Sequence, residues 1–159
     1  MTNKGAPQAR PGRVLALDVG KKRIGLALSD ELGLTAQGLE TLQRTRVRED
    51  VERLRELAEG KGATMLLIGY PLQMNGVEGR QVRWVREFGD MITKRTGLAV
   101  EYWDERLTSV EANRVLRSSG ISIAKRGAAV DRLSAVILLD SFLERQRLER
   151  LRQAEQPEE

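Results

Sequence analysis

Carboxylates close two apolar segments of this sequence and lie near the start of a third. Asp18 ends the run "VLALD", Asp104 and Glu105 follow the run "GLAVEYW", and Asp131 lies early in "AAVDRLSAVILL". Taken alone, each acid has an ordinary structural explanation. Asp18 could cap a turn, Asp104 and Glu105 could form a surface ion pair with Arg106, and Asp131 could stabilise a helix start through the helix dipole. Their shared position at the ends of buried elements instead predicts one carboxylate cluster.

The chemistry of such a cluster follows from its charge. If the strands that end at Asp18 and Asp104 run parallel, their carboxyl ends meet at one edge of the sheet, where α/β proteins bind ligands. The small residues Ser134 and Ala135 would let the last helix approach that edge and direct Asp131 towards it. Clustered carboxylates repel each other unless cations lie among them, and their oxygen atoms favour Mg²⁺ or Mn²⁺. Two such ions can hydrolyse a phosphodiester bond by activating water and stabilising the leaving oxygen.

Cationic side chains accompany these acids along the chain. The candidates for phosphate binding are Lys21, Lys22, Arg23, Arg106, Lys125 and Arg126. Guanidinium and ammonium groups bind phosphate oxygens well. The net charge of +4 and the pI of about 9.8 add modest support for a polyanionic partner. The sequence therefore predicts a nucleic-acid partner.

Two absences narrow the chemistry further. The chain has no cysteine and no histidine. This composition excludes thiolate nucleophiles, Ser-His triads and histidine-based metalloenzymes. The start "MTNKGAPQARPGR" lacks the apolar core of a signal peptide, and no apolar run approaches the length of a membrane helix. We therefore expect a soluble cytoplasmic protein without a membrane partner.

Hydrophobic patterning predicts an α/β domain between two polar ends. The expected strands are Val14–Leu17, Arg23–Ser29, "GLETLQR", "TMLLIGYP" and "GLAVEYWDER". Two expected helices contain Val47 to Ala58, ending at Gly60, and Val82 to Ile92, and a third is capped by "TSVE" at 108–111. The last expected helix begins at about Ala129, after a loop with Gly120, Lys125, Arg126 and Gly127. Short turns between the first strands and helical crossovers later predict a five-stranded mixed sheet with helices on both faces. Residues 1–12 form a basic arm, 13–143 the domain, and 144–159 a charged helical tail. Trp84 and Trp103 are expected in the core or at an interface.

Four segments in this order carry a family resemblance: "LALDVGKKRIGLALSD", "LLIGYPLQMNG", "WDERLTS" and "VDRLSAVILL". They resemble the YqgF/RuvX family, ribonuclease-H-like nucleases related to the RuvC Holliday junction resolvases. The resemblance covers about Arg13 to Leu143. It implies an RNase H-like α/β fold with a five-stranded mixed sheet, its first three strands antiparallel, flanked by helices. It also implies either Holliday junction resolution or processing of the 5′ end of the precursor of 16S rRNA.

The resemblance implies metal ligands at Asp18, at an acid of "DER" and at Asp131. Strand alternation places Asp104 with Tyr102 and Glu105 with Trp103, and because both faces carry apolar residues this pattern does not choose between the two acids. By analogy with the resolvases we prefer Glu105, with Asp104 supporting or replacing it as a catalytic residue. A homodimer is compatible with junction resolution but is not specified by the sequence.

Two other functions fit parts of the sequence. A catalytically silent nucleic-acid-binding domain would keep the cations and lose the acids, whereas this chain keeps all three acidic positions. An actin-like ATPase or sugar kinase would share the hairpin "LDVGKKRIG". However, Lys21 stands where that hairpin usually has Thr or Ser, and 159 residues are too few for two such domains. A metal-dependent nuclease therefore accounts for more of the sequence than either alternative.

Overall fold

The apolar hairpin at the start of the chain is the centre of a five-stranded sheet. The computed structural model describes residues 12–71, 79–104 and 123–156. The strands are β1 (Arg13–Val19), β2 (Arg23–Ser29), β3 (Ala36–Gln43), β4 (Ala63–Tyr70) and β5 (Ala99–Asp104), and the helices are α1 (Val47–Lys61), α2 (Arg80–Thr96) and α4 (Ile123–Glu155). The sheet order is β3-β2-β1-β4-β5. The first three strands are antiparallel, and β4 and β5 run parallel to β1, so the expected mixed α/β sheet is confirmed.

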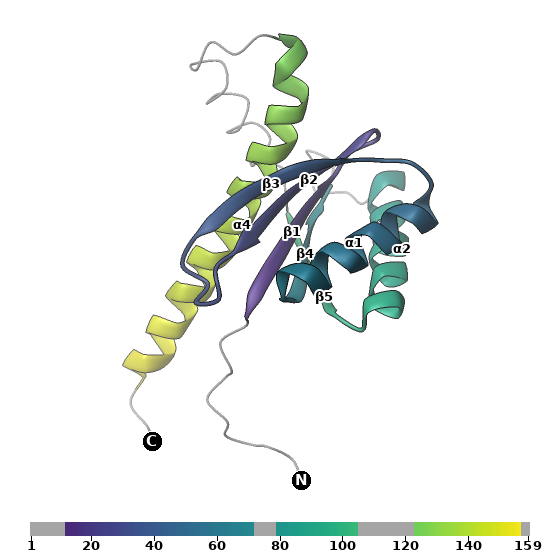
Figure 1. Ribbon diagram of the computed structural model, residues 1–159. Helices are drawn as coiled ribbons and strands as arrows, with labels where there is room; N and C mark the ends of the chain where they lie inside the picture. The colour runs from purple at the N-terminus through teal and green to yellow at the C-terminus, as the bar shows by residue number, and fades with distance from the viewer. Residues whose placement is uncertain (1–11, 72–78, 105–122, 157–159) are drawn as a thin grey trace.

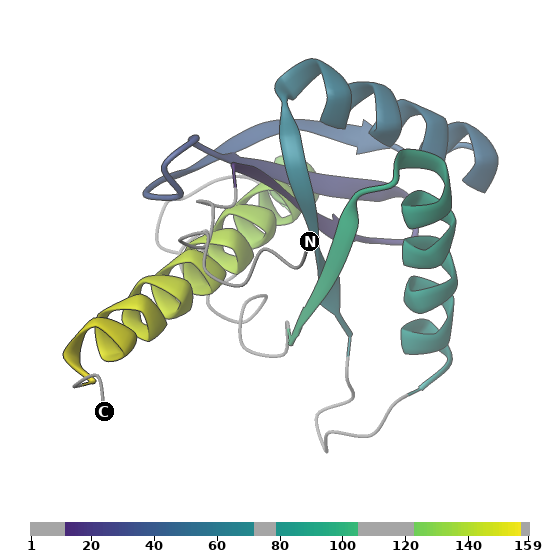
Figure 2. The ribbon, with the colours of Figure 1, turned by 90° about the horizontal axis from the view of Figure 1, so that it is seen from below.

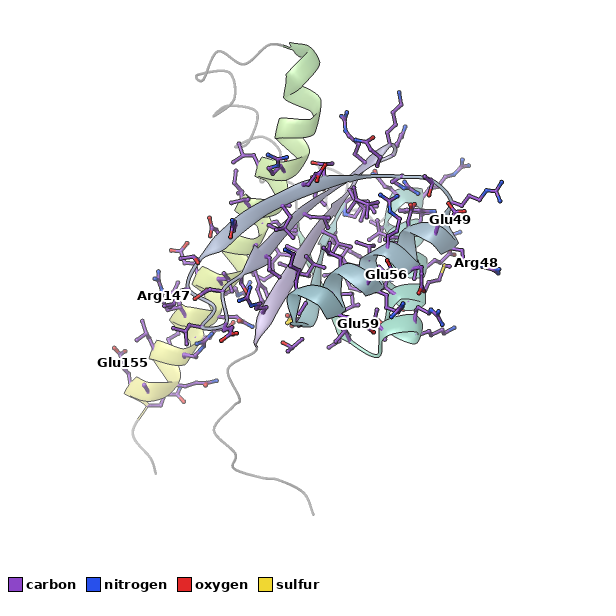
Figure 3. The ribbon with its side chains drawn as sticks, in the orientation of Figure 1. Arg48, Glu49, Glu56, Glu59, Arg147 and Glu155 are labelled. Carbon is purple, nitrogen blue, oxygen red and sulfur yellow. The ribbon has the colours of Figure 1, made fainter. Side chains whose placement is uncertain are left out.

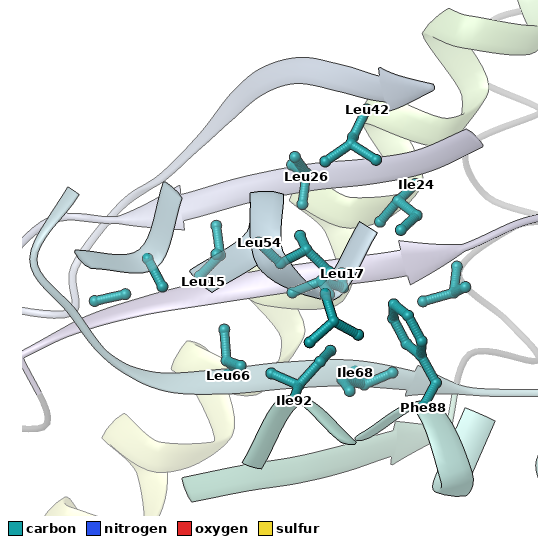
Figure 4. Close-up of a cluster of buried hydrophobic side chains, with 14 of the residues drawn as sticks. Leu15, Leu17, Ile24, Leu26, Leu42, Leu54, Leu66, Ile68, Phe88 and Ile92 are labelled. Carbon is teal, nitrogen blue, oxygen red and sulfur yellow. The ribbon is translucent and has the colours of Figure 1, made fainter. Parts of the chain in front are cut away.

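The helices cover both faces of this sheet, as Figures 1 and 2 show. Helices α1 and α2 pack on one face, over a cluster of large side chains from both helices and the sheet (Figure 4). Helix α4 crosses the other face and forms a second cluster with Val14, Ala16, Ala27 and Leu67. Charged residues such as Arg48, Glu56 and Arg147 line the outer sides of the helices and point away from the sheet (Figure 3).

Two expected helix boundaries were wrong, and most strand ends differ from the expected ones by one or two residues. Helix α1 ends at Lys61 rather than at Gly60, because Gly62 takes the left-handed conformation with φ 69° and closes the helix by donating its N–H to Ala58 and Glu59 carbonyls. Helix α4 begins at Ile123 rather than near Ala129, so the expected loop at 125–127 is helical. A glycine inside a helix costs only about 1 kcal/mol, so Gly127 does not stop it. The expected helix start at 108–111 lies outside the described residues.

The expected C-terminal tail continues a core helix. Helix α4 extends without interruption from its packed half to Glu155, so the charged segment after Leu143 is helical, as expected. Within the described ranges, no helix combines the length and the apolar character that a membrane crossing requires.

Candidate active site at the carboxyl edge of the sheet

Asp18 lies one residue before the end of β1, at the edge of the sheet where β1, β4 and β5 all end. Its side chain shares a face with Ala16 and alternates with Leu17, which places it on the face covered by α4. The residue is half-buried, because helix and sheet cover it only in part. This position agrees with the expected site at a strand end.

Glycines flank Asp18 on both neighbouring strands. Gly25 pairs with it on β2, and on β4 Gly69 follows Ile68, the residue paired with Leu17. The next strand places Trp103 opposite Gly69. No side chain therefore stands directly beside Asp18 within the sheet, which leaves room around its carboxylate on the α4 face. Local sequence patterns do not reveal this row of glycines, because strand register is a long-range property.

The "DER" acids divide between the two faces. Asp104 pairs with Tyr70 and alternates with Tyr102, which packs against the α1/α2 cluster. Asp104 therefore belongs to the face opposite that of Asp18, and it is exposed. Trp103 packs against the α4 cluster, donates its indole N–H to Ser141 Oγ at 3.3 Å and meets the Phe142 ring edge-on, so its expected core role is confirmed. Glu105 and Arg106 lie outside the described residues.

Asp131 lies on the helix that covers Asp18. It comes eight residues after Ile123, so it occupies the third turn of α4 rather than the first turn that the sequence suggested. Figure 1 shows the N-terminal part of α4 at the end of the sheet where β1 ends. Only the backbone of Asp131 is described; one turn later Ser134 and Ala135 are fully covered by the sheet, as their small size predicted. A dipole role for Asp131 loses its support, since that effect is limited to the first turn.

The close approach of α4 depends on small residues in the strands as well. At Gly38 of β3, a Cβ atom would lie 2.8 Å from Arg132 Cγ and 3.3 Å from Val136 Cγ2. Ser29 Oγ is buried and accepts a hydrogen bond from the Val14 N–H at 2.8 Å, so a polar side chain in this layer is satisfied within the sheet. The contact at Gly38 lets α4 lie close to the sheet that carries Asp18.

The β1–β2 turn presents the first expected cations beside Asp18. The Gly20 N–H donates to the Arg23 carbonyl at 2.9 Å, which closes a tight turn. Lys21 and Lys22 are exposed at its tip, and Arg23 is half-buried at the start of β2. Lys125 and Arg126 lie in the first turn of α4, where the structure describes only their backbone. The turn therefore brings two exposed ammonium groups, those of Lys21 and Lys22, to the edge of the sheet that carries Asp18.

Arg44 holds this turn in place, a role that the sequence analysis missed. The Nη1 atom of Arg44 donates to the Gly20 carbonyl at 2.8 Å and to the Lys21 carbonyl at 3.2 Å, and its backbone N–H donates to the Lys22 carbonyl at 2.9 Å. Its Nε lies 3.7 Å from a carboxylate oxygen of the fully buried Asp50. No sequence motif signals this contact, because Arg44 and the turn meet only through the pairing of β2 with β3.

Asp50 and Trp84 support Arg44 from two helices. Asp50 Oδ1 accepts hydrogen bonds from the Thr45 N–H at 3.0 Å and from Thr45 Oγ1 at 3.2 Å. The Arg44 guanidinium carbon lies 4.4 Å from the centre of the Trp84 ring, which also stacks on Phe88 at 5.2 Å. Trp84 is thus half-buried and packed, in agreement with the expected core role.

The side chains that the structure describes do not complete a metal centre. Among them, no group of three acidic residues could hold a metal ion, and Asp18 is the expected ligand whose side chain is described. The backbone places Asp18 and the helix that bears Asp131 on one face of the sheet, and Lys21 and Lys22 follow Asp18 in the β1–β2 turn. Such an arrangement can hold a cation on its carboxylates and a phosphate on its ammonium groups.

Sequence comparisons connect the chain to a named family. A family model described as "RuvX: Holliday junction resolvase" matches residues 12–145. A Koribacter versatilis protein named "Putative pre-16S rRNA nuclease" is 52% identical over 144 residues, which span 91% of this chain and 94% of that protein. A Carboxydothermus hydrogenoformans protein of the same name is 45% identical over 131 residues, spanning 82% and 95%.

Solved structures show the same fold at low identity. Thermus thermophilus RuvC in complex with a Holliday junction substrate matches with a TM-score of 0.56 and 17% identity, over 86% of this chain and 96% of that one. The Fowlpox virus resolvase in complex with Holliday junction DNA matches with a TM-score of 0.53 and 10% identity, over 84% and 98%. Because the family match spans nearly the whole domain and the relatives align along most of their length, the chain belongs to the RuvX family of nucleases.

Proposed function

We propose that this protein is a divalent-metal-dependent endonuclease that hydrolyses phosphodiester bonds of structured nucleic acid beside Asp18. The observation that carries the proposal is the half-buried Asp18 carboxylate, which stands between Gly25 and Gly69 at the carboxyl edge of the sheet. A carboxylate in this position can bind a cation, and glycines on the two neighbouring strands leave space beside it within the sheet. Membership of the RuvX family supports the same reaction.

Asp18, Glu105 and Asp131 are the proposed ligands of Mg²⁺ or Mn²⁺. Their donor chemistry fits these ions, because carboxylate oxygens bind hard cations and the chain has no cysteine or histidine for softer ones. Asp104 lies on the α1/α2 face, opposite that of Asp18. We therefore propose Glu105, the other acid of "DER", as the ligand and keep Asp104 outside the ligand set.

Each part of the edge has a separate task in the reaction. When bound, the ions would activate the attacking water and offset the charge that develops on the leaving oxygen. The carboxylates hold those ions in place, and Lys21 and Lys22 bind the phosphates of the strand, together with the proposed contacts of Arg23, Arg106, Lys125 and Arg126. Arg44 fixes the turn on which the two lysines stand.

The substrate that we propose is the precursor of 16S rRNA. The relatives that share 52% and 45% identity along most of their length carry a name with that substrate. A second candidate is the Holliday junction, which the description of the matching family names. Junction resolution needs two symmetric nicks, and a two-fold homodimer is the simplest device that supplies them. Trimming an RNA needs one cut, for which a monomer suffices.

A cleavage panel tests the reaction and the substrate together. Precursor 16S rRNA, a four-way DNA junction, duplex DNA and single strands are incubated with Mg²⁺, Mn²⁺ or EDTA. We expect cleavage of the precursor RNA that EDTA abolishes and that Asp18→Asn and Glu105→Gln both remove, whereas Asp104→Asn retains most of it. Paired symmetric nicks in the junction, with the RNA left intact, would favour the homodimeric resolvase. Tight binding without cleavage of any substrate would indicate the catalytically silent alternative.

A further inference from the structure

A cationic pocket lies on the other side of the β1–β2 turn from Asp18. Its volume is about 390 Å³, and its lining includes Gly20, Lys21, Arg44, Arg80, Gln81 and Trp84. These residues come from the turn, from the segment after β3 and from the first two turns of α2, whose N-terminal end lies next to the turn in Figure 1. The described lining contains three cations and no acid.

Two of the three cations have no carboxylate to balance them. In residues 12–71, 79–104 and 132–156, whose side chains the structure describes, no acid forms an ion pair with Lys21 or with Arg80, and both are exposed. Arg44 differs, because Asp50 offsets its charge at 3.7 Å. The pocket therefore keeps an uncompensated positive potential at the sheet edge.

The start of α2 adds to this potential. Arg80 is the first residue of the helix, the first turn has no acid, and Gly79 provides no side-chain cap. A cation is unfavourable near a helix N-terminus, where the helix dipole already places positive charge. Helix α1 shows the ordinary arrangement, with Glu49 and Asp50 in its first turn. The charge at α2 thus reduces stability locally, and it suits an anion bound at the exposed N–H groups.

The pocket is rigid, and its aromatic ring is already engaged. Arg44 joins the turn to Asp50 and Trp84 through contacts of 2.8 Å, 3.7 Å and 4.4 Å. Trp84 stacks on Phe88 with an angle of 11° between the rings. A ring held between these partners serves the wall of the pocket rather than a nucleic-acid base. The groups that remain for a ligand are therefore the cations and helix N–H groups, which recognise phosphate.

The position of the pocket connects it to the proposed reaction. Val19, which also lines it, directly follows Asp18, so the pocket begins one residue from the acid but opens on the α1/α2 side. A strand whose phosphate lies at Asp18 can pass over the turn and reach the pocket. We propose that Lys21, Arg80 and the start of α2 form a second phosphate subsite that binds the nucleic-acid strand flanking the cut. This proposal rests on the proposed nuclease function.

Salt-dependent binding tests this subsite without any cleavage. A fluorescent four-way DNA junction is titrated in EDTA with wild type, Arg80→Gln and the matched control Arg83→Gln, which removes an exposed arginine outside the pocket on the same helix. Loss of one phosphate contact should reduce the slope of log K against log salt by about 0.9 in Arg80→Gln. Arg83→Gln should leave the slope unchanged. Equal slopes in the two variants would overturn the subsite.

Three further measurements separate the explanations. Arg80→Gln should melt at an unchanged or higher temperature, because it removes a cation from a helix start. Lys21→Gln combined with Arg80→Gln should lose less than the sum of the single effects if both bind one phosphate. ATP provides the other source of phosphate, and Arg80-dependent ATP binding without any change in the junction slope would overturn the proposal. A normal Arg80-dependent slope with no cleavage of any substrate would instead refute the nuclease function and leave the subsite standing.

Discussion

The strand residues on the two faces of the sheet differ in size, although helix α4 itself contributes large side chains such as Phe142. The α1/α2 face is filled by leucine, isoleucine and phenylalanine side chains, with Phe88 and Leu54 wholly enclosed. The α4 face places Ala16 and Ala27 of the strands against Ala135 of the helix. Both faces exclude water, but only the second brings a helix close to the backbone of the strands. The carboxylate Asp18 lies on that second face.

This difference in side-chain size assigns the two faces different roles, one in the stability of the fold and the other in the geometry of the site. Large apolar side chains contribute most of the burial, at about 1.5 to 3 kcal/mol for each enclosed leucine or phenylalanine. Small residues contribute less burial, but they let Asp131 on α4 approach the strand that carries Asp18. We infer that the α1/α2 face holds the sheet together and carries the cationic turn, while the α4 face sets the spacing of the acids.

Asp131→Asn is the most direct test of the difference between the two faces of the sheet. If Asp131 serves the site on the α4 face, its replacement removes a ligand and reduces cleavage by about 100-fold or more, since even residues that support a metal ligand cost 10- to 100-fold. Stability should be unchanged or higher, because one of several mutually repelling carboxylates is gone. Turnover and thermal melting measured on the same preparation check both parts. Full activity with reduced stability would return Asp131 to a structural role.

Leu54→Ala tests the α1/α2 face in the opposite sense. Leu54 is wholly enclosed between α1 and the sheet (Figure 4), so its truncation leaves a cavity and should lower the free energy of unfolding by about 2 to 5 kcal/mol. The rate of cleavage by the remaining folded protein should stay close to that of wild type. Urea unfolding combined with activity per folded molecule measures the two effects, and a large loss of specific activity would refute the division between the faces.

Ala135→Leu overfills the close contact on the α4 face. Ala135 is wholly enclosed, so the larger side chain should cost about 1 to 3 kcal/mol and displace α4 from the strands. Cleavage should fall by more than stability alone explains, because Asp131 moves with the helix. Half-buried Val136 and exposed Ser141 are poor controls because both contact residues of the sheet layer. Arg150→Leu on the exposed end of α4 adds the same side chain without that contact. Equal activity in both variants would show that helix spacing does not matter.

The sequence predicted the local elements well and the contacts between them poorly. The run Arg23–Ser29 and the parallel strands were recognisable because apolar periodicity is local, and the small residues Ser134 and Ala135 correctly indicated a close contact between the last helix and the sheet. The start of α4 was misplaced because Gly127 resembled a loop residue. Arg44 and the glycine row beside Asp18 were missed, because both arise from strand register, which no local pattern specifies.

The unfolding free energy measured as a function of pH should reveal how much the ion pairs of Glu52 stabilise the contact between α1 and α2. Glu52 accepts hydrogen bonds from Arg55 Nε and Arg95 Nε, both at 2.8 Å, and so connects α1 with α2. The hydrogen bond from Arg55, followed by that from Arg95, lowers the pKa of Glu52 from 4.5 to about 2. Its stabilising effect is therefore present above pH 4.5 and lost as the pH falls towards 2. Wild type should exceed Glu52→Gln in unfolding free energy at pH 6 but not at pH 2, and a constant difference would contradict this.

Asp140 on α4 should change the pH dependence of stability in the opposite direction and by a smaller amount. Partial burial, with a contribution from Glu144, raises the pKa of Asp140 above its ordinary value of 3.8. A carboxylate with a raised pKa in the folded state favours folding when protonated, so stability falls as the pH rises through the interval between the two values. Asp140→Asn should therefore be slightly more stable than wild type at neutral pH and should lose that advantage near pH 3. Opposite pH trends for Glu52→Gln and Asp140→Asn, measured by urea unfolding in the same buffers, would show that ion pairing stabilises the contact between α1 and α2, whereas desolvation of a carboxylate opposes folding on α4. Parallel trends would show that the two helical layers do not differ in this respect.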